Sequence, residues 1–124
     1  MKKLIIQDTD QDLLDTITIM LSDATYEVLP ITQYAEVFNK IDMFRPHLVM
    51  LDFRPSGEES KAVCLKIKQQ FPNLTVIALS CNINIEKEYV KAGFDDYIQK
   101  PFDIDHLFSV VNKNSALSNP YQQH

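Results

Sequence analysis

The 124-residue sequence has few glycines, no tryptophan and little cysteine. Its two glycines, Gly57 and Gly93, cannot form the glycine-rich loops GxxxxGK[ST] or GxGxxG that cradle phosphates. Nucleotide-binding folds that depend on those loops are therefore excluded. Cys64 and Cys81 lie far apart, without a CxxC or Cys/His pattern. We expect two reduced, partly buried thiols and neither a disulfide nor a zinc site.

Positive charge and long apolar runs are also scarce. Lys and Arg number 12 against 17 Asp and Glu, which gives a formal net charge of -5 at pH 7. Because the basic residues are scattered, we expect no direct binding to nucleic acid or to membranes. The longest apolar runs, such as 48–51, are too short to cross a bilayer, and the N-terminus lacks a signal-peptide pattern. The sequence predicts a soluble, cytoplasmic protein.

What the sequence does contain is an alternation of short apolar runs with longer amphipathic stretches. The runs, which we expect to be strands, are residues 4–6, 26–29, 47–51, 74–79 and 96–98. Apolar residues recur at helical spacing in the stretches 13–21, 34–41, 63–71, about 85–92, and 104–111. A βα unit repeated five times predicts an α/β fold, with a parallel sheet covered by helices on both faces.

Four of the apolar runs are followed directly by residues with complementary chemistry. Asp8 comes after the first run, Asp52 after the third, Ser80 after the fourth and Lys100 closely after the fifth. In an open parallel sheet these positions share one edge, which is where the functional crevice lies. Two neighbouring carboxylates repel each other unless a cation lies between them, and Mg²⁺ prefers oxygen ligands. A hydroxyl and an ammonium group would suit the oxygens of a phosphoryl group.

The chain resembles a receiver domain of the response-regulator family, of the chemotaxis-regulator kind, from about Lys2 to Asn112. The resemblance is carried by KLIIQD at 3–8, PHLVMLD at 46–52, Ser80 and AGFDDYIQKPF at 92–102. It implies a flavodoxin-like, doubly wound sheet of five parallel strands in the order 2-1-3-4-5, with five helices. It also implies a role in a two-component regulatory system. Residues 113–124 are expected to form a polar C-terminal tail.

The resemblance further implies a phosphoacceptor site. Asp52 would accept a phosphoryl group from the phosphohistidine of a sensor histidine kinase or phosphotransfer protein. Lys100 would pair with the carboxylate and then with the phosphoryl oxygens. Ser80 would be the switch hydroxyl, and Tyr97 the aromatic residue that turns inward. The bond from Lys100 to Pro101 is expected to be cis. Slow hydrolysis of its own aspartyl phosphate is the only catalysis expected.

This sequence departs at one position from the magnesium site of the family. By resemblance, Asp8, Asp52 and the backbone carbonyl of Arg54 would serve the metal, with Asp8 holding a metal-bound water. The second acid that usually follows Asp8 and binds the metal directly is replaced by Thr9, so we expect weakened Mg²⁺ binding. The cationic side chain of Arg54 is placed to lean over the acidic pocket and to replace part of the ion's charge.

Two functions remain open from the sequence. The first is a working phosphoacceptor; the second is a pseudo-receiver, a phosphorylation-independent interaction module whose metal site Thr9 has weakened. A phosphatase of the haloacid-dehalogenase type is disfavoured, because it needs an acid two residues after the nucleophile and Arg54 is there. Asp103 fits a helix N-cap better than a catalytic cluster.

The resemblance also indicates how the domain would pass on its signal. No effector domain follows in this sequence. We therefore expect output through a downstream protein target or a self-dimer. The family uses the fourth helix, fifth strand and fifth helix as its output face, which here includes Tyr97, Phe102 and residues 103–112.

Overall fold

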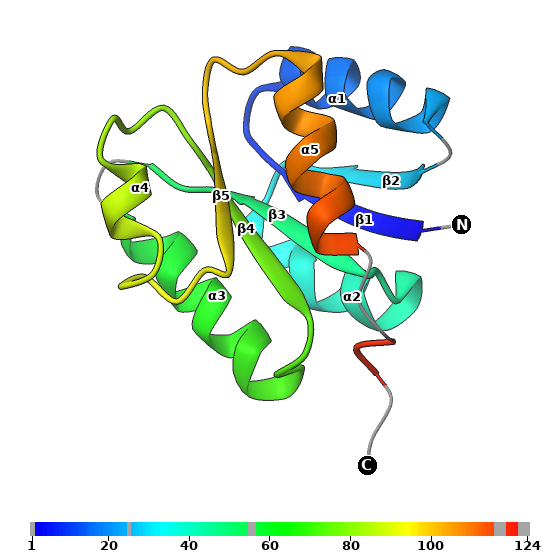
Figure 1. Ribbon diagram of the computed structural model, residues 1–124. Coiled ribbons are helices and arrows are strands. Elements are labelled where there is room, and N and C mark those ends of the chain that lie inside the picture. The colour runs from blue at the N-terminus through cyan, green and yellow to red at the C-terminus, as the bar shows by residue number, and fades with distance from the viewer. Residues whose placement is uncertain (1, 25, 55–56, 116–118, 122–124) are drawn as a thin grey trace.

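Five parallel strands form the central sheet of the computed structural model, which describes residues 2–24, 26–54, 57–115 and 119–121. Their order across the sheet is β2-β1-β3-β4-β5, which confirms the flavodoxin-like topology (Figure 1). The strands are β1 (Lys2–Gln7), β2 (Tyr26–Ile31), β3 (Leu48–Asp52), β4 (Thr75–Ser80) and β5 (Asp96–Gln99).

Five α-helices cover both faces of this sheet, as the sequence predicts. They are α1 (Gln11–Asp23), α2 (Val37–Phe44), α3 (Glu58–Gln70), α4 (Ile85–Glu88) and α5 (Ile104–Ser115), and a short 3-10 turn, η1 (Tyr34–Glu36), precedes α2. Helices α1 and α5 pack on one face, and α2, α3 and α4 on the other (Figure 1).

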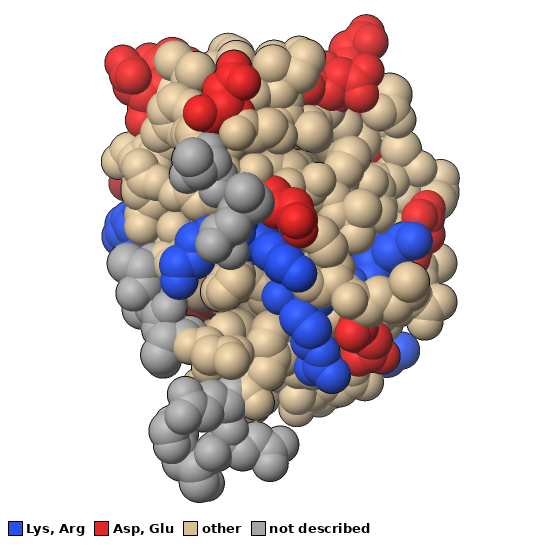
Figure 2. All heavy atoms as spheres, turned by 90° about the vertical axis from the view of Figure 1, so that its right-hand side faces the viewer, with Lys and Arg blue, Asp and Glu red and all other residues tan. Residues whose placement is uncertain are grey.

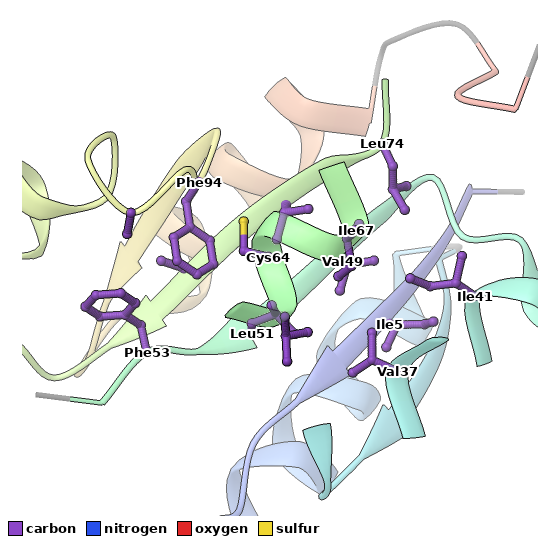
Figure 3. Close-up of a cluster of buried hydrophobic side chains, with 14 of the residues drawn as sticks. Ile5, Val37, Ile41, Val49, Leu51, Phe53, Cys64, Ile67, Leu74 and Phe94 are labelled. Atoms are coloured by element: carbon purple, nitrogen blue, oxygen red, sulfur yellow. The ribbon is translucent and has the colours of Figure 1, made fainter. Parts of the chain in front are cut away.

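Alternate residues of each inner strand pack into two separate hydrophobic cores, one on each face of the sheet. In β1, Leu4 and Ile6 pack toward α1 and α5, whereas Ile5 packs toward α2 and α3. In β3, Met50 faces the first core and Val49 the second. Figure 3 shows the second core, where side chains from β1 and β3 meet those of α2 and α3. Because both faces are buried, each inner strand is apolar along nearly its whole length.

The two prolines that follow helices mark their ends as predicted. Helix α2 ends at Phe44, and Arg45, directly before Pro46, has the left-handed φ of 54°. Helix α3 ends at Gln70, just before Phe71 and Pro72. At the start of α5, the carboxylate of Asp103 accepts a hydrogen bond from the backbone N–H of His106 at 2.8 Å, which confirms it as an N-cap.

The fourth helix is shorter than the sequence predicts. We expected a helix over about 85–92, but α4 spans only Ile85–Glu88, and the chain continues in turns to Gly93. Ile85 and Ala92 are buried and Val90 is exposed, and the chain closes in a tighter turn in which the Gly93 N–H donates to the Val90 carbonyl at 3.0 Å. Gly93 has a φ of 93°, the left-handed conformation expected at this end.

The predicted boundary between domain and tail at residue 112 lies inside α5, which continues to Ser115. In the described part of the tail, Tyr121 packs against the domain. Its ring meets that of Phe71 edge-on, with 5.7 Å between centroids, and its hydroxyl donates to the carbonyl of Pro46 at 2.6 Å. Residues 119–121, the described part of the tail after α5, therefore contact the domain through this partly buried aromatic side chain.

The structure agrees only in part with what the composition predicts for the thiols. Both cysteines are free; Cys64 is buried, and burial raises the pKa of its thiol to about 12, whereas Cys81 is exposed, not partly buried as expected.

Figure 2 shows Lys and Arg side chains across the middle of one face, interspersed with Asp and Glu. In the part of the chain that is described, no helix has the length and apolarity needed to cross a membrane.

His47 ties the beginning of β3 to β1. Its Nδ1 accepts a hydrogen bond from the backbone N–H of Lys3 at 3.0 Å, and its own backbone N–H donates to the Lys3 carbonyl at 2.7 Å. Burial, followed by the charge of Lys2, lowers the pKa of His47. The folded protein therefore favours the neutral ring, which the accepting Nδ1 requires.

We predict that His47 makes folding stability depend on pH near neutrality. Above the ordinary pKa of about 6.5 its contribution is fully present, and it is lost as the pH falls through the lower folded pKa. His47→Asn keeps an acceptor for Lys3 but cannot take up this proton. Urea unfolding between about pH 7.5 and 5.5 should therefore give a flatter profile for the variant. Parallel profiles for the two proteins would contradict this assignment.

Gly57 is required by two features of the turn into α3. Its φ is 63°, and a Cβ added there would lie 2.7 Å from Cζ of the Phe53 ring. We predict that Gly57→Ala lowers the free energy of unfolding by about 1–3 kcal/mol, through backbone strain and overpacking. The measurement is urea denaturation. In a Phe53→Leu background the alanine should cost less, because the ring contact is gone; an equal cost would show that the ring plays no part.

Candidate functional site

Two carboxylates and one ammonium group meet at the carboxyl edge of the sheet. Asp8 follows β1, Asp52 ends β3, and Lys100 follows β5. The Nζ of Lys100 lies 2.9 Å from Asp8 Oδ2 and 3.4 Å from Asp52 Oδ1. Both carboxylates are buried, with only 2% of Asp8 and 5% of Asp52 exposed. The structure thus brings together three of the four residues that the strand ends predict.

Lys100 stays charged at this edge despite its burial. Burial opposes the charge, but the hydrogen bond to Asp8 and the charges of Asp52 and Asp8 outweigh it, so the pKa of Lys100 is raised. The bond from Lys100 to Pro101 is cis, as the resemblance implies. Lys100 therefore supplies a fixed positive charge beside the acidic pair.

Ser80, the fourth predicted residue, lies at the same edge but is engaged elsewhere. It is fully buried at the end of β4, and its Oγ donates a hydrogen bond to the carbonyl of Phe53 at 2.6 Å. The same oxygen accepts from the backbone N–H of Asn82 at 3.0 Å. The hydroxyl therefore links the residue after Asp52 to the loop that leads into α4.

Arg54 leans over the acidic pair, as the sequence predicts. Its Nε donates to Asp52 Oδ2 at 3.1 Å, and its Nη2 donates to Thr9 Oγ1 at 2.6 Å. Asp10 does not supply the carboxylate that Thr9 lacks, because it caps α1 and accepts from the backbone N–H of Leu13 at 3.2 Å. A guanidinium thus lies between Asp52 and the position of the missing acid.

Two further side chains, which the sequence analysis did not place at the site, hold the backbone of Asp52. The Oε1 of buried Gln7 accepts from the Asp52 N–H at 3.2 Å, while its Nε2 donates to the carbonyl of Thr32 at 3.0 Å. The hydroxyl of Tyr34 donates to the Asp52 carbonyl. A polar residue inside a buried strand is a signal that could have identified Gln7. Tyr34 fits the apolar stripe of a helix and gives no such signal.

Asp52 is reached from solvent through a pocket of about 220 Å³. The pocket is lined by Asp52, Phe53, Arg54, Cys81, Asn82 and Lys100. A second pocket of about 400 Å³ lies beside it and is lined in part by Gln7, Thr9, Tyr34 and Arg54. Arg54 lines both, so its side chain separates them.

Comparison with known proteins identifies this arrangement. Residues 4–112 match the family described as the response regulator receiver domain. The chain belongs to this family. It is 32% identical over 92 residues to the DNA-binding transcriptional regulator NtrC of Escherichia coli K12, which covers 72% of this chain and 19% of NtrC. The chain therefore spans about a fifth of that relative's length.

Solved structures agree with this assignment. A response regulator from Thermotoga maritima superposes on this receiver with a TM-score of 0.84 at 27% identity, covering 94% of this chain and 98% of that one. The receiver domain of NtrX from Brucella abortus gives a TM-score of 0.81 at 29% identity, covering 93% and 99%. The resemblance stated from the sequence is thereby confirmed for the family and for the fold.

Receiver domains generally bind Mg²⁺ at the acidic pocket, but the donor set of this receiver differs. Within the described residues, no group of three or more His, Cys, Asp and Glu side chains could hold a metal. Beside Asp8 and Asp52, this edge offers the backbone carbonyl of Arg54 and the neutral hydroxyl of Thr9, whereas the guanidinium of Arg54 repels a cation. In this arrangement the residues do not fit Mg²⁺, because both carboxylates that would hold it already pair with cationic side chains.

Tyr97, the predicted switch aromatic, lies on β5 away from the charged pocket. Its ring is partly buried and packs on that of Tyr89, with 4.9 Å between centroids and a tilt of 42°. It is thus on the α4 side of the sheet. The roles of Tyr97 and of Ser80 in switching stay predictions.

We predict that Lys100→Met destabilises this receiver by about 1–3 kcal/mol, because Asp8 and Asp52 then keep their burial and lose a shared cation. Urea unfolding measures the change. Lys100→Arg, which keeps the charge, should cost less. Adding Asp8→Asn to Lys100→Met should recover part of the loss, and a double variant with simply additive costs would argue against the pairing.

Proposed function

We propose that this receiver domain accepts a phosphoryl group on Asp52 and thereby switches a partner-binding face. The observation that supports this function is the pairing of buried Asp52 with Lys100, at 3.4 Å, beside a pocket that both residues line. Within this pocket an anionic group could approach the carboxylate and meet a fixed positive charge on arrival. The expected donor is the phosphohistidine of a histidine kinase or phosphotransfer protein in the cytoplasm.

The transfer step needs only groups that are present on donor and acceptor. One carboxylate oxygen of Asp52 attacks phosphorus and forms the new P–O bond. The P–N bond to the donor histidine breaks with its electron pair on that nitrogen, and a proton on the other ring nitrogen lets the histidine leave as neutral imidazole. Lys100 and Arg54 would offset the negative charge that gathers on the phosphoryl oxygens. We expect no catalysis beyond slow hydrolysis of the resulting aspartyl phosphate.

The added charge would then act on Ser80. A phosphoryl group carries a charge of about -2 and three strong acceptor oxygens. Its anionic oxygens are better acceptors than the Phe53 carbonyl that Ser80 now uses. Movement of Ser80 would alter the loop into α4 and the face formed by α4, β5 and α5, where Tyr97 lies. Phe102, which is expected on that face, lines a pocket on the α1 side with Leu13, Ile17 and Met20. A downstream protein or a second copy of the chain would bind the face formed by α4, β5 and α5.

A second candidate function is a phosphorylation-independent interaction module. The observation that favours it is the hydrogen bond from Arg54 to Asp52 Oδ2, because it engages one of the two oxygens that could attack phosphorus. In such a pseudo-receiver the folded surface alone would carry the function, and Asp52 would stay unmodified.

Labelling with a small phosphodonor distinguishes the two functions. We predict that acetyl phosphate with about 10 mM Mg²⁺ adds the mass of one phosphoryl group to the wild type, as read by intact-protein mass spectrometry. Asp52→Asn should abolish the addition. Asp10→Asn is the matched control, because it changes a nearby acid that caps α1, and asparagine also caps helices.

Each outcome assigns one function. Addition to the wild type and to Asp10→Asn, but not to Asp52→Asn, supports the phosphoacceptor. Addition that persists in Asp52→Asn places the modification elsewhere and contradicts the proposal. An unchanged wild-type mass, together with unchanged amide NMR shifts on adding beryllofluoride and Mg²⁺, would favour the interaction module.

A further inference from the structure

The Arg54 side chain bridges the loop after β1 and the end of β3. Its two donors reach Thr9 Oγ1 and Asp52 Oδ2, whereas Lys100 faces the other oxygen of Asp52. Thr9 stands where the second acid of a receiver is usual. The guanidinium therefore spans the two positions between which a metal ion would otherwise be shared.

The charged groups of this pocket balance without any added ion. Asp8 and Asp52 contribute two negative charges, and Lys100 and Arg54 contribute two positive charges through the ion pairs that join them. Asp10, the next acid along the chain, is engaged in capping α1. Adding a divalent cation would leave a net positive pocket, so the repulsion between carboxylates that normally favours Mg²⁺ is already relieved.

The contact with Thr9 is what distinguishes this guanidinium from an ordinary surface charge. The Arg54 side chain is half-exposed, and an exposed ion pair alone contributes little. Here, however, the group has a second hydrogen bond on a different loop, and its carboxylate partner is buried. The hydroxyl of Thr9 can accept this N–H, yet it brings no charge that would attract a metal.

We propose that Arg54, anchored on Thr9, is the resident cation of this pocket and excludes Mg²⁺ from it. The proposal concerns the unphosphorylated domain. It therefore stands or fails separately from phosphorylation of Asp52, which is measured by mass. Its direct consequence is that folding stability does not respond to Mg²⁺.

The test compares thermal unfolding with and without Mg²⁺ at constant ionic strength. Wild-type Tm should not change with about 10 mM Mg²⁺. Arg54→Ala/Thr9→Asp removes the cation, restores the acid and keeps the backbone carbonyl of residue 54. Its Tm should rise by about 5 °C once Mg²⁺ is roughly tenfold above Kd. Lys61→Ala/Thr16→Asp makes the same charge change on exposed helical positions and should show no response.

Two results of this experiment would overturn the proposal. One is a wild-type Tm that rises with Mg²⁺ as much as that of the Arg54→Ala/Thr9→Asp variant, because Mg²⁺ would then bind beside the guanidinium. The other is a folded double variant that ignores Mg²⁺, because Arg54 would then not be what excludes the ion. If the double variant unfolds without Mg²⁺ and folds with it, the proposal is supported. Arg54→Gln is the milder variant for calorimetric titration and should bind Mg²⁺ where the wild type does not.

The anchoring role of Thr9 has its own readout. Thr9→Val keeps the shape of the side chain and removes the hydroxyl that accepts from Arg54. The Nε–H signal of Arg54 in a ¹⁵N NMR spectrum should be resolved in the wild type and broadened by exchange with water in this variant. An Arg54 signal that is the same in both proteins would show that Thr9 does not hold the guanidinium.

Discussion

The ammonium group of Lys100 lies between two carboxylates that the sheet buries, and the organisation of the site depends on this contact. Asp8 and Asp52 are brought together because the strands that carry them, β1 and β3, are parallel neighbours whose carboxyl ends coincide. Two buried negative charges at one edge are unfavourable unless cations compensate them. β5 ends at the same edge and supplies Lys100, 2.9 Å from Asp8. The sheet topology thus places two buried carboxylates side by side, and it also brings in the lysine that compensates most of their charge.

The negative charge that Lys100 does not offset is compensated differently here than in a receiver with two adjacent acids after its first strand. With Thr9 after Asp8, the site has one carboxylate fewer, and Arg54 has a neutral acceptor, the Thr9 hydroxyl, in addition to Asp52. A threonine in the loop after β1 and a guanidinium after β3 are complementary: the first lacks a negative charge that is usual there, and the second adds a positive one. Both features favour balance of the charges at this edge by its own side chains.

Burial explains which parts of this molecule could be predicted from sequence. The two-faced sheet requires apolar residues at successive positions, such as Leu4, Ile5 and Ile6, and these runs predict the strands and their carboxyl ends. Asp8, Asp52 and Lys100 follow from the same reasoning. The length of α4 could not be predicted, because its apolar spacing does not reveal that the backbone continues in turns after Glu88.

Side-chain contacts that follow no periodic pattern could not be predicted from the sequence. The hydrogen bond from Tyr34 to the Asp52 carbonyl, the anchoring of Arg54 on Thr9, and the orientation of Ser80 all depend on how loops approach one another in space. The leaning of Arg54 over the pocket could be predicted from its position, but not the atom that would hold it there.

The hydrogen bonds around Asp52 also determine where a conformational switch could begin. Gln7 holds the Asp52 N–H and Tyr34 its carbonyl, so the acceptor backbone is held from the β1 and η1 side. On the β4 side the Phe53 N–H donates to the Leu79 carbonyl at 2.9 Å, and Ser80 adds the side-chain contact. Ser80 Oγ donates to Phe53 and accepts from Asn82, so rotating it away releases both partners together. A new anionic acceptor at Asp52 would compete for that one donor, and the backbone freed as a result would be the loop into α4.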